Sequence, residues 1–419
     1  MKRAPKPQQS VERGLPPLPA LQRLKRTHSL MVAGETAMAI ALADSLFLSV
    51  SPDAARGKII LFLAVSMAPF VVVSPLIGPR IDRLKGGHRM VVILVGIMRA
   101  LVLIGISQVV KSKEIIPSIG LYILVFSAMI LGKTYAIAKS AIVPSTVEFE
   151  DDLVKANSKL GQIAGITGFI VAIPVGILQF ISTTAALGFG VLAYLFAALN
   201  AYRMPKIAVA TKPAEKLEIE ELHSASIVST GNAMRVLRGC VGFMFFHLAF
   251  WLRGEVAGTA WFGFALGMIG VSVLLANTVS PFLKSHMRES MMMLSALVAV
   301  AISGIIAAWY DRVVGGILLA AIVNAAATVG KLAFDSTVQS DAPDANRGRA
   351  FAQFETRNQV AWVAGGLIPV VFSPSGEIGF AIVALVGIIG SAMYFRASGI
   401  AMKSRGEQAT DQEHPLRSE

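Results

Sequence analysis

The chain has 419 residues, of which 54% are hydrophobic and only 15% are charged, and its formal net charge is +12. Soluble domains usually contain about 25% charged residues, so this composition excludes a soluble enzyme, a disulfide-stapled secreted domain and a disordered protein. The single cysteine, Cys240, permits no internal disulfide and no cysteine metal cluster. The apolar residues come in blocks of roughly 20, the length that a membrane-spanning helix needs. The sequence therefore predicts a polytopic membrane protein.

Twelve apolar blocks follow one another along the chain, and each predicts a membrane-spanning helix. Helices are expected because open sheet edges cannot be satisfied in lipid and because alternating barrel strands are absent from the pattern. The first block is too long for a cleavable signal and ends without a small-residue cleavage site. The predicted spans are 28–51, 57–78, 90–110, 117–138, 161–182, 185–203, 234–253, 258–283, 290–309, 313–334, 356–373 and 378–396.

The spans fall into two groups of six, so we predict an all-α protein built from two six-helix bundles. A charged stretch in the connection between them, residues 215–221, is expected to form a short amphipathic helix on the membrane surface. The predicted organisation is a cytoplasmic tail (1–27), an N-terminal bundle (28–203), a cytoplasmic linker (204–233), a C-terminal bundle (234–396) and a second cytoplasmic tail (397–419).

Short matches between the two halves indicate an internal repeat. Leu131-Gly132-Lys133 in span four returns as Val329-Gly330-Lys331 in span ten, 198 residues later. Ile173-Pro174-Val175 in span five returns as Ile368-Pro369-Val370 in span eleven, 195 residues later. A parallel repeat of six-span halves is one of the transporter architectures.

The distribution of Lys and Arg predicts the orientation in the membrane. With a cytoplasmic N-terminus, the inner segments hold 29 of the 38 basic residues and the outer loops hold six. The positive-inside rule then predicts that both termini lie in the cytoplasm. The protein itself is predicted to lie in the cytoplasmic membrane. The net charge is explained by these inner segments, and no nucleic-acid partner is predicted.

The loop after span two carries a recognisable motif. It reads Gly78-Pro79-Arg80-Ile81-Asp82-Arg83-Leu84-Lys85-Gly86-Gly87-His88-Arg89 and resembles the signature of the major facilitator superfamily, G-x-x-x-D-R-x-G-[RK]-[RK]. It departs from the signature where Lys85 replaces the expected Gly. Glycine lets helix ends approach closely, and the basic residues hold the inner surface. From this motif we predict a gating role for Gly78, Asp82, Arg83 and Arg89.

Two further loops are similar to the bacterial efflux-type branch of that superfamily, which includes drug and siderophore exporters. Leu153-Val154-Lys155-Ala156-Asn157 matches its L-x-x-A-N, and Arg347-Gly348-Arg349-Ala350-Phe351 matches its R-G-R-x-F, which adds Arg347 and Arg349 to the predicted gating residues. The antiporter signature G-P-x-x-G-G is only partly present in span five, since Ile173 precedes Pro174 where Gly is expected.

The resemblance implies a transport mode. It implies a central cavity lined by spans one, four, seven and ten, and secondary active transport of a small molecule outward in exchange for protons. Two alternatives stay open: uptake of a nutrient or movement of lipid by the same fold, and a membrane sensor or assembly factor that has lost transport. The expected partners are the substrate, protons and membrane lipids, and the expected state is a monomer.

Charged residues inside the predicted spans are the main candidates for the substrate or ion pathway, because a charge in hydrocarbon is costly and function commonly compensates for it. Lys331 is expected to snorkel to the inner surface. Glu35 is predicted to lie at about the same depth in the membrane as the cations Lys133 and Arg99. Of these two, Lys133 is the slightly favoured partner of Glu35. Asp44 faces the opposite side of span one and is either a proton carrier or a packing residue hydrogen-bonded to a neighbouring helix. The set is Glu35, Asp44, Arg99, Lys133 and Lys331.

Three uncharged residues complete the candidate pathway. His247, deep in span seven, is either a structural residue or a group that binds substrate or titrates, and Trp251 shares its helical face. Asn324 lies in span ten. This mixed set would suit an amphipathic, zwitterionic or cationic substrate. No enzyme activity, cofactor or metal site is predicted, because Gly132-Lys133-Thr134 ends no complete P-loop and no residues show metal-ligand spacing.

Overall fold

The computed structural model describes residues 20–47, 86–111, 119–149, 152–204, 225–254, 258–310, 312–341 and 347–413. These residues form long α-helices and one short 3-10 turn, η1 (Val143–Thr146), with no strand in the described ranges. In the first half the helices are α1 (Ala20–Phe47), α4 (Gly87–Lys111), α5 (Ile119–Ile142), α6 (Leu153–Ile181) and α7 (Thr183–Tyr202). In the second half they are α9 (Ala225–Gly254), α10 (Gly258–His286), α11 (Glu289–Tyr310), α12 (Val313–Asp341), α13 (Arg347–Phe372) and α14 (Gly376–Glu413).

Within the described ranges, nine helices are long and apolar enough to cross a membrane, which makes this a multi-pass membrane protein. The other two, α1 and α13, carry more polar residues. Eleven of the predicted spans each coincide with a described helix, and the span predicted at 57–78 lies outside the described residues. Large apolar side chains are exposed in both halves, among them Phe180, Phe196 and Trp309. Lipid is the environment that suits such a surface.

Several helices extend well beyond the apolar blocks that predicted them. Helix α12 continues to Asp341 although its block ends at 334, and α13 begins at Arg347 although its block begins at 356. Helix α9 begins at Ala225, so residues 225–233 of the predicted linker are helical. The amphipathic helix predicted at 215–221 lies outside the described residues. Hydropathy marks the stretch that lies in hydrocarbon, whereas helical hydrogen bonding continues past it.

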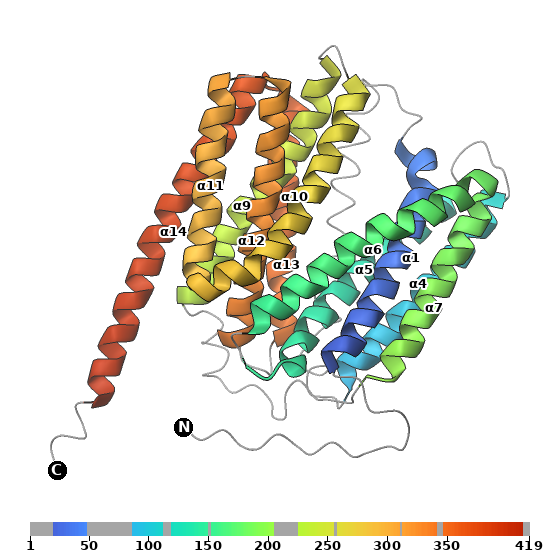
Figure 1. Ribbon diagram of the computed structural model, residues 1–419, viewed down its shortest axis with the longest axis horizontal. Helices are drawn as coiled ribbons and strands as arrows, with labels where there is room; N and C mark the ends of the chain where they lie inside the picture. Colours follow the sequence, from blue (N-terminus) through green and yellow to red (C-terminus); the bar gives the residue numbers. More distant parts are fainter. Residues whose placement is uncertain are drawn as a thin grey trace.

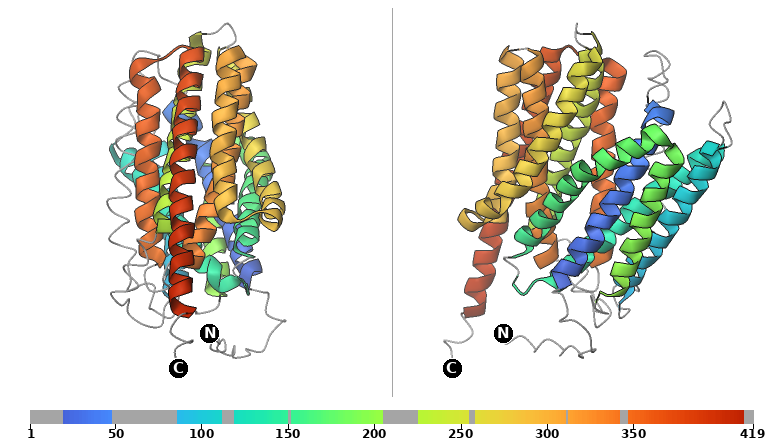
Figure 2. Two further views of the ribbon diagram at one scale, coloured as in Figure 1. Left: turned by 90° about the vertical axis from the view of Figure 1, so that its left-hand side faces the viewer. Right: turned by 45° about the vertical axis from the view of Figure 1, so that its right-hand side comes forward.

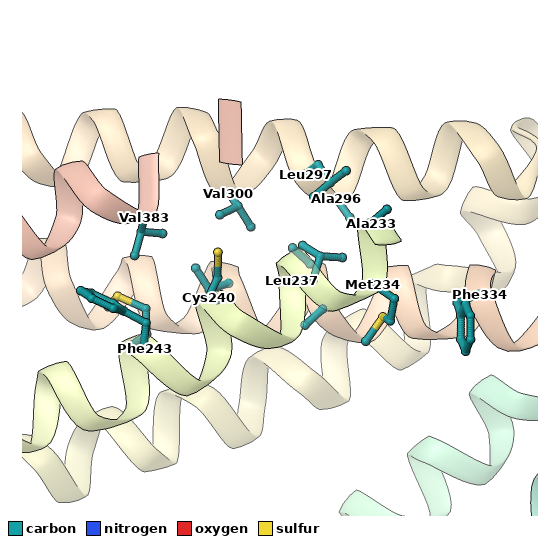
Figure 3. Close-up of a cluster of buried hydrophobic side chains, with 14 of the residues drawn as sticks. Ala233, Met234, Leu237, Cys240, Phe243, Ala296, Leu297, Val300, Phe334 and Val383 are labelled. Atoms are coloured by element: carbon teal, nitrogen blue, oxygen red, sulfur yellow. The ribbon is translucent and has the colours of Figure 1, made fainter. Parts of the chain in front are cut away.

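Each half has its own hydrophobic core. The core of the first half joins buried side chains of α1, α4, α5, α6 and α7, with Tyr194 and Leu103 fully buried. The core of the second half joins α9 to α11, α12, α13 and α14. Figure 3 shows part of it, with Leu237, Cys240 and Phe243 of α9 lying near side chains of the neighbouring helices. Separate cores allow each half to behave as a unit.

The two halves meet toward one end of the molecule. Figure 1 shows α6 crossing α10 in the lower part of the view, near the end at which α1 begins and α14 ends, while the two groups of helices diverge toward the other end. The right-hand view in Figure 2 shows the same divergence. Contacts of α6 with α12 and of α5 with α13 complete the interface. We call this end of the molecule the joined end.

Candidate substrate site between the two halves

An ion pair links the halves directly. Lys133 of α5 donates from Nζ to Glu355 Oε1 of α13 at 3.2 Å, and the two side chains are 30% and 24% exposed. Lys133 lies about nine residues from the C-terminal end of α5, and Glu355 about eight residues into α13. Partial burial strengthens such a pair relative to one in open water. The pair therefore ties α5 to α13 in this conformation.

Lys331 makes a pair within its own helix. Its Nζ lies 3.0 Å from Oδ1 and 2.9 Å from Oδ2 of Asp335, four residues further along α12. The Asp335 side chain is only 8% exposed, whereas that of Lys331 is 49% exposed. The predicted snorkelling of Lys331 toward the inner surface stays a prediction; the structure shows a local ion pair, which the i, i+4 spacing on a helix favours.

Glu35 pairs with Arg99. Of the two cations left open by the sequence, the structure places Arg99 Nη2 3.4 Å from Glu35 Oε1. Arg99 is almost fully buried and also lies over the ring of Tyr194, with its Cζ 5.0 Å from the ring centroid. A Cβ built on Gly132 would come 2.7 Å from Arg99 Nη2. Glycine at this position lets the guanidinium lie directly against α5.

Further charges surround the Lys133–Glu355 pair. Arg238 of α9 interacts electrostatically with the carboxylate of Glu355, as do Lys133 and Lys331. Lys139 of α5 interacts electrostatically with Lys331, Asp335 and Glu355. We call these six side chains from both halves the interhalf charge cluster: Lys133, Lys139, Arg238, Lys331, Asp335 and Glu355.

Uncharged polar contacts join the halves beside this cluster, closer to the joined end. Asn157 donates to the side chain of Gln339 at 2.7 Å, and Gln339 donates to the carbonyl oxygen of Ser140 at 3.0 Å. On α6, Ser158 and Gln162 donate to the carbonyl oxygen of Asn277 of α10. Hydrogen bonds of this kind contribute only about 0.5–1.5 kcal/mol each. Together with apolar contacts of Ile137 and Val154 against the second half, these hydrogen bonds hold the joined end.

His247 and Trp251 lie away from the cluster, in an aromatic group of the second half. His247 is 1% exposed and stacks on Phe243 and Trp251, with Phe380 at its edge. It lies nine residues beyond Arg238 on α9, or about 13 Å along the helix. Its Nε2 has no hydrogen-bond partner within the described part of the chain. The ring of His247 is thus packed among aromatic side chains, and the choice between a structural role and a role in binding or titration stays a prediction.

Asn324 is also engaged within its own helix. Its Nδ2 donates to the carbonyl oxygen of Ala320 at 2.9 Å, and its side chain is half-buried. It lies seven residues from Lys331, or about 10 Å along α12. The structure therefore does not bring Asn324, His247 or Trp251 together with the charged candidates.

Most of the predicted gating residues fall outside what the structure describes. Gly78, Asp82 and Arg83 lie in the range 48–85, which is not among the described residues. Arg89 is described: its Nη1 donates to the carbonyl oxygen of Met204 at 2.9 Å, and its guanidinium lies 5.0 Å from the ring centroid of Tyr202. It thereby binds the end of α7.

Three more candidates lie on described helices, but their side chains are outside the described set. Asp44 lies near the end of α1, and Arg347 and Arg349 lie at the start of α13. Among the described residues, no group of three or more His, Cys, Asp or Glu side chains is placed to hold a metal ion.

Four members of the interhalf charge cluster were missed by the sequence analysis. Asp335 lies one residue after the predicted span 313–334, and Glu355 one residue before the span 356–373. Both fall outside the candidate set because that set was drawn from charges inside the predicted spans. The i, i+4 spacing of Lys331 and Asp335 could have revealed the first. Only the packing of α13 against α5 and α9 reveals Glu355, Lys139 and Arg238 as neighbours.

The sequence matches no family model. Two relatives are uncharacterized proteins. One, from Mycobacterium leprae, is 26% identical over 396 residues, which cover 86% of this chain and 68% of the relative. The other, from Mycobacterium tuberculosis, is 27% identical over 396 residues, which cover 86% of this chain and 70% of the relative.

Solved structures define the fold. The chain is similar to a bacterial homologue of the iron transporter ferroportin in an outward-facing state, with a TM-score of 0.72 and 15% identity over 91% of this chain and 100% of that one. It is also similar to the proton:xylose symporter XylE, with a TM-score of 0.67 and 12% identity over 90% and 95%. The transporter FucP in the outward conformation gives a TM-score of 0.61 and 11% identity over 91% and 98%. The protein thus has the major facilitator fold that the motif after span two implied.

Proposed function

We propose that this protein is a secondary active transporter that moves a small molecule across the cytoplasmic membrane by alternating access. The observation that carries the proposal is the junction between the halves: two units, each with its own core, are tied at one end by the Lys133–Glu355 ion pair, by polar hydrogen bonds and by apolar contacts of Ile137 and Val154. Rocking of one such unit against the other is how repeat-built transporters alternate access. The transporters among the solved structures of this fold support the same reading.

The conformation is proposed to be outward-facing. The joined end is the end at which α1 begins and α14 ends, and the bias of basic residues predicts that this end is cytoplasmic. A molecule joined at its cytoplasmic end and divergent at the other is open to the outside. The similar ferroportin homologue was likewise solved in an outward-facing state.

Transport is proposed to be proton-coupled efflux. The loop motifs Leu153–Asn157 and Arg347–Phe351 support the efflux direction through their resemblance to exporters of this fold. The carboxylates Glu35 and Asp44 in α1 are the proposed groups for proton exchange. Similarity to a proton:xylose symporter favours one alternative, proton-driven uptake. The sign of the pH gradient that accelerates flux in proteoliposomes separates the two directions.

Cross-linking tests alternating access. In a background with Cys240 replaced, Asn157→Cys with Gln339→Cys joins two hydrogen-bonded positions on opposite halves. Oxidation should lock the joined end and stop flux, and a reductant should restore it. The matched control pair, Lys284→Cys with Glu289→Cys, lies within one half and should leave flux unchanged on oxidation. Undiminished flux through the locked Asn157–Gln339 variant would reject the proposal.

Cysteine labelling tests the orientation. In the same background, Lys113→Cys probes a predicted outer loop and Glu215→Cys the predicted cytoplasmic linker. Impermeant reagents added outside the cell should label Lys113→Cys and not Glu215→Cys. The reverse pattern would invert the topology and with it the outward-facing assignment.

Two substitutions test coupling and gating. If Asp44 carries the proton, Asp44→Asn abolishes proton-driven transport while substrate exchange continues. Normal transport with an unchanged pH profile would instead show a packing role.

Asp82→Asn should lower the transport rate and leave substrate affinity near wild type, because the predicted position of Asp82 is at a cytoplasmic helix end. A large loss of affinity at an unchanged rate would contradict a gating role.

A further inference from the structure

A proline inside α10 leaves one backbone carbonyl without its helical donor. Pro281 lies five residues before the end of α10. Proline has no N–H for the bond to the carbonyl four residues earlier, and its ring pushes that carbonyl aside. The carbonyl belongs to Asn277, a residue that is only 4% exposed. It is therefore free to accept hydrogen bonds from another helix.

The donors to this carbonyl come from the opposite half. Ser158 Oγ and Gln162 Nε2 of α6 both donate to the Asn277 carbonyl oxygen, the second at 3.2 Å. The two donors are four residues apart and lie on one face of α6. Ser158 is fully buried, and Gln162 is half-buried. Two hydrogen bonds thus pass from the first half to a single backbone atom of the second.

A glycine permits this close approach. Gly161 lies between the two donors in the sequence, and a Cβ built on it would overlap the side-chain amide of Asn277. That amide is itself held, because its Nδ2 donates to the carbonyl oxygen of Val273 at 2.9 Å. A larger residue at position 161 would therefore push α6 away from α10.

The contact lies on the side of the α6–α10 crossing that faces the joined end (Figure 1). Further along the same two helices, a Cβ built on Gly270 would come 3.4 Å from the ring of Phe169. Phe169 is eleven residues beyond Ser158, or about 16 Å along α6. A separation of the halves that begins at the joined end would break the Ser158 contact before the Phe169 contact. Water could then reach the Asn277 carbonyl and replace its donors.

We propose that the Asn277 carbonyl, freed by Pro281, is a latch between the halves: Ser158 and Gln162 hold it while the joined end is closed, and water replaces them when the joined end opens. This inference rests on the proposed alternating access. The latch differs from an ordinary hydrogen bond between helices because its acceptor lacks the usual helical donor. Without Ser158 and Gln162 the carbonyl is left unsatisfied in the closed state alone, so the latch favours the closed joined end.

The rate at which a buried thiol is alkylated measures how often the joined end opens. In the full-length protein with Cys240 replaced, Asn157→Cys places the only thiol in a buried contact between the halves. A water-soluble maleimide reaches this thiol only after the halves separate, so its rate follows the open population even when that population is small. The measurement is made in detergent and needs neither substrate nor flux.

Removal of both donors should release the latch. Ser158→Ala with Gln162→Leu should raise the alkylation rate about tenfold, because a buried carbonyl loses its partners only in the closed state. The matched control is Ser303→Ala, which removes a buried hydroxyl that donates to a carbonyl of its own helix. It should leave the rate unchanged. A wild-type rate in the variant without donors would overturn the proposal.

Gly161→Ala tests the latch without removing a polar group. The added methyl should push α6 off Asn277 and raise the alkylation rate, although both donors are still present. An unchanged rate would contradict the close approach on which the latch depends.

Pro281→Ala tests the part played by the proline. Alanine restores an N–H that can satisfy the Asn277 carbonyl whether the joined end is closed or open. Loss of both α6 donors should then raise the alkylation rate much less than it does with Pro281 present. Pro369→Ala removes a proline from the interior of α13 and should leave the full effect. Equal effects in all three backgrounds would show that Pro281 frees no latch, and would overturn the proposal.

The outcome is separable from that of the proposed function. Flux that stops when the Asn157–Gln339 disulfide forms, together with alkylation rates that ignore the α6 donors, would keep the transporter and reject the latch. Alkylation rates that depend on the donors and on Pro281, in a protein that shows no flux, would keep the latch and reject transport.

Discussion

Lysines at equivalent positions in the two halves have different neighbours. Lys133 and Lys331 are equivalent in the repeat, but the residue four positions later is Ile137 in the first half and Asp335 in the second. Asp335 pairs with Lys331 on the same helix, whereas Ile137 is buried in the hydrophobic core of the opposite half. Lys133 has no carboxylate at that position and reaches across to Glu355.

This difference separates a contact within one helix from contacts between the halves. The Lys331–Asp335 pair lies within α12, so it needs no contact between the two halves. The Lys133–Glu355 pair and the burial of Ile137 both depend on α5 remaining against the second half. In the proposed transport cycle the contacts of Lys133 and Ile137 are therefore the ones that would break, whereas the Lys331–Asp335 pair requires no contact between the halves.

The largest expected effect comes from giving the first half the residue of the second. Ile137→Asp should cost about 3–5 kcal/mol of closed-state stability, because it removes a buried apolar side chain and offers Lys133 a local carboxylate. Spin-label distances across the joined end should lengthen. Ile137→Asn removes the same packing without the charge, so identical distances in the two variants would show that the charge has no part in the effect.

A smaller effect is expected from the cross pair itself. Lys133→Gln or Glu355→Gln should each cost about 1–3 kcal/mol, since one partly buried charge loses its partner. The double variant should cost less than the sum of the two single ones, as a double-mutant cycle on unfolding free energies would measure. Strict additivity would mean that the two groups do not interact in solution.

The next largest effect on stability is expected at Gly132, where glycine lets the Arg99 guanidinium approach α5 closely. Gly132→Ala should destabilise the protein by about 1 kcal/mol, because the added methyl meets Arg99 Nη2 and displaces it from Glu35. Gly176→Ala on α6, where a Cβ meets nothing within 4 Å, is the matched control. It should be neutral or stabilising, since alanine is the better helix former. Equal melting temperatures for the two variants would contradict the packing of Arg99 against α5.

The smallest effect is expected from the local pair of the second half. Asp335→Asn should change stability by only about 0.3–0.5 kcal/mol, because the pair is an i, i+4 contact whose lysine is half exposed to solvent screening. Spin-label distances across the joined end should stay at their wild-type values. A lengthening as large as that in Glu355→Gln would show that Asp335 also holds the halves together.

Sequence reasoning located the charges of the apolar blocks but assigned their partners imperfectly. Glu35 and Arg99 were both identified, yet the slightly favoured partner of Glu35 was Lys133, which the structure pairs with Glu355. Depth along a helix can be counted from residue numbers, whereas the direction in which a side chain points toward a neighbouring helix cannot. Glu355 was passed over because it precedes its apolar block by one residue.

The sequence by itself determined that this is a multi-pass membrane protein of the major facilitator fold, because apolar length, the positions of basic residues and the loop motif are properties of local composition. Only the tertiary structure decided which charges meet. The lysine of one half finds its carboxylate 222 residues away, on a helix whose polar first turns hydropathy had placed outside the membrane. The Lys133–Glu355 pair depends on how the two halves pack against each other, and no local sequence pattern predicts that packing.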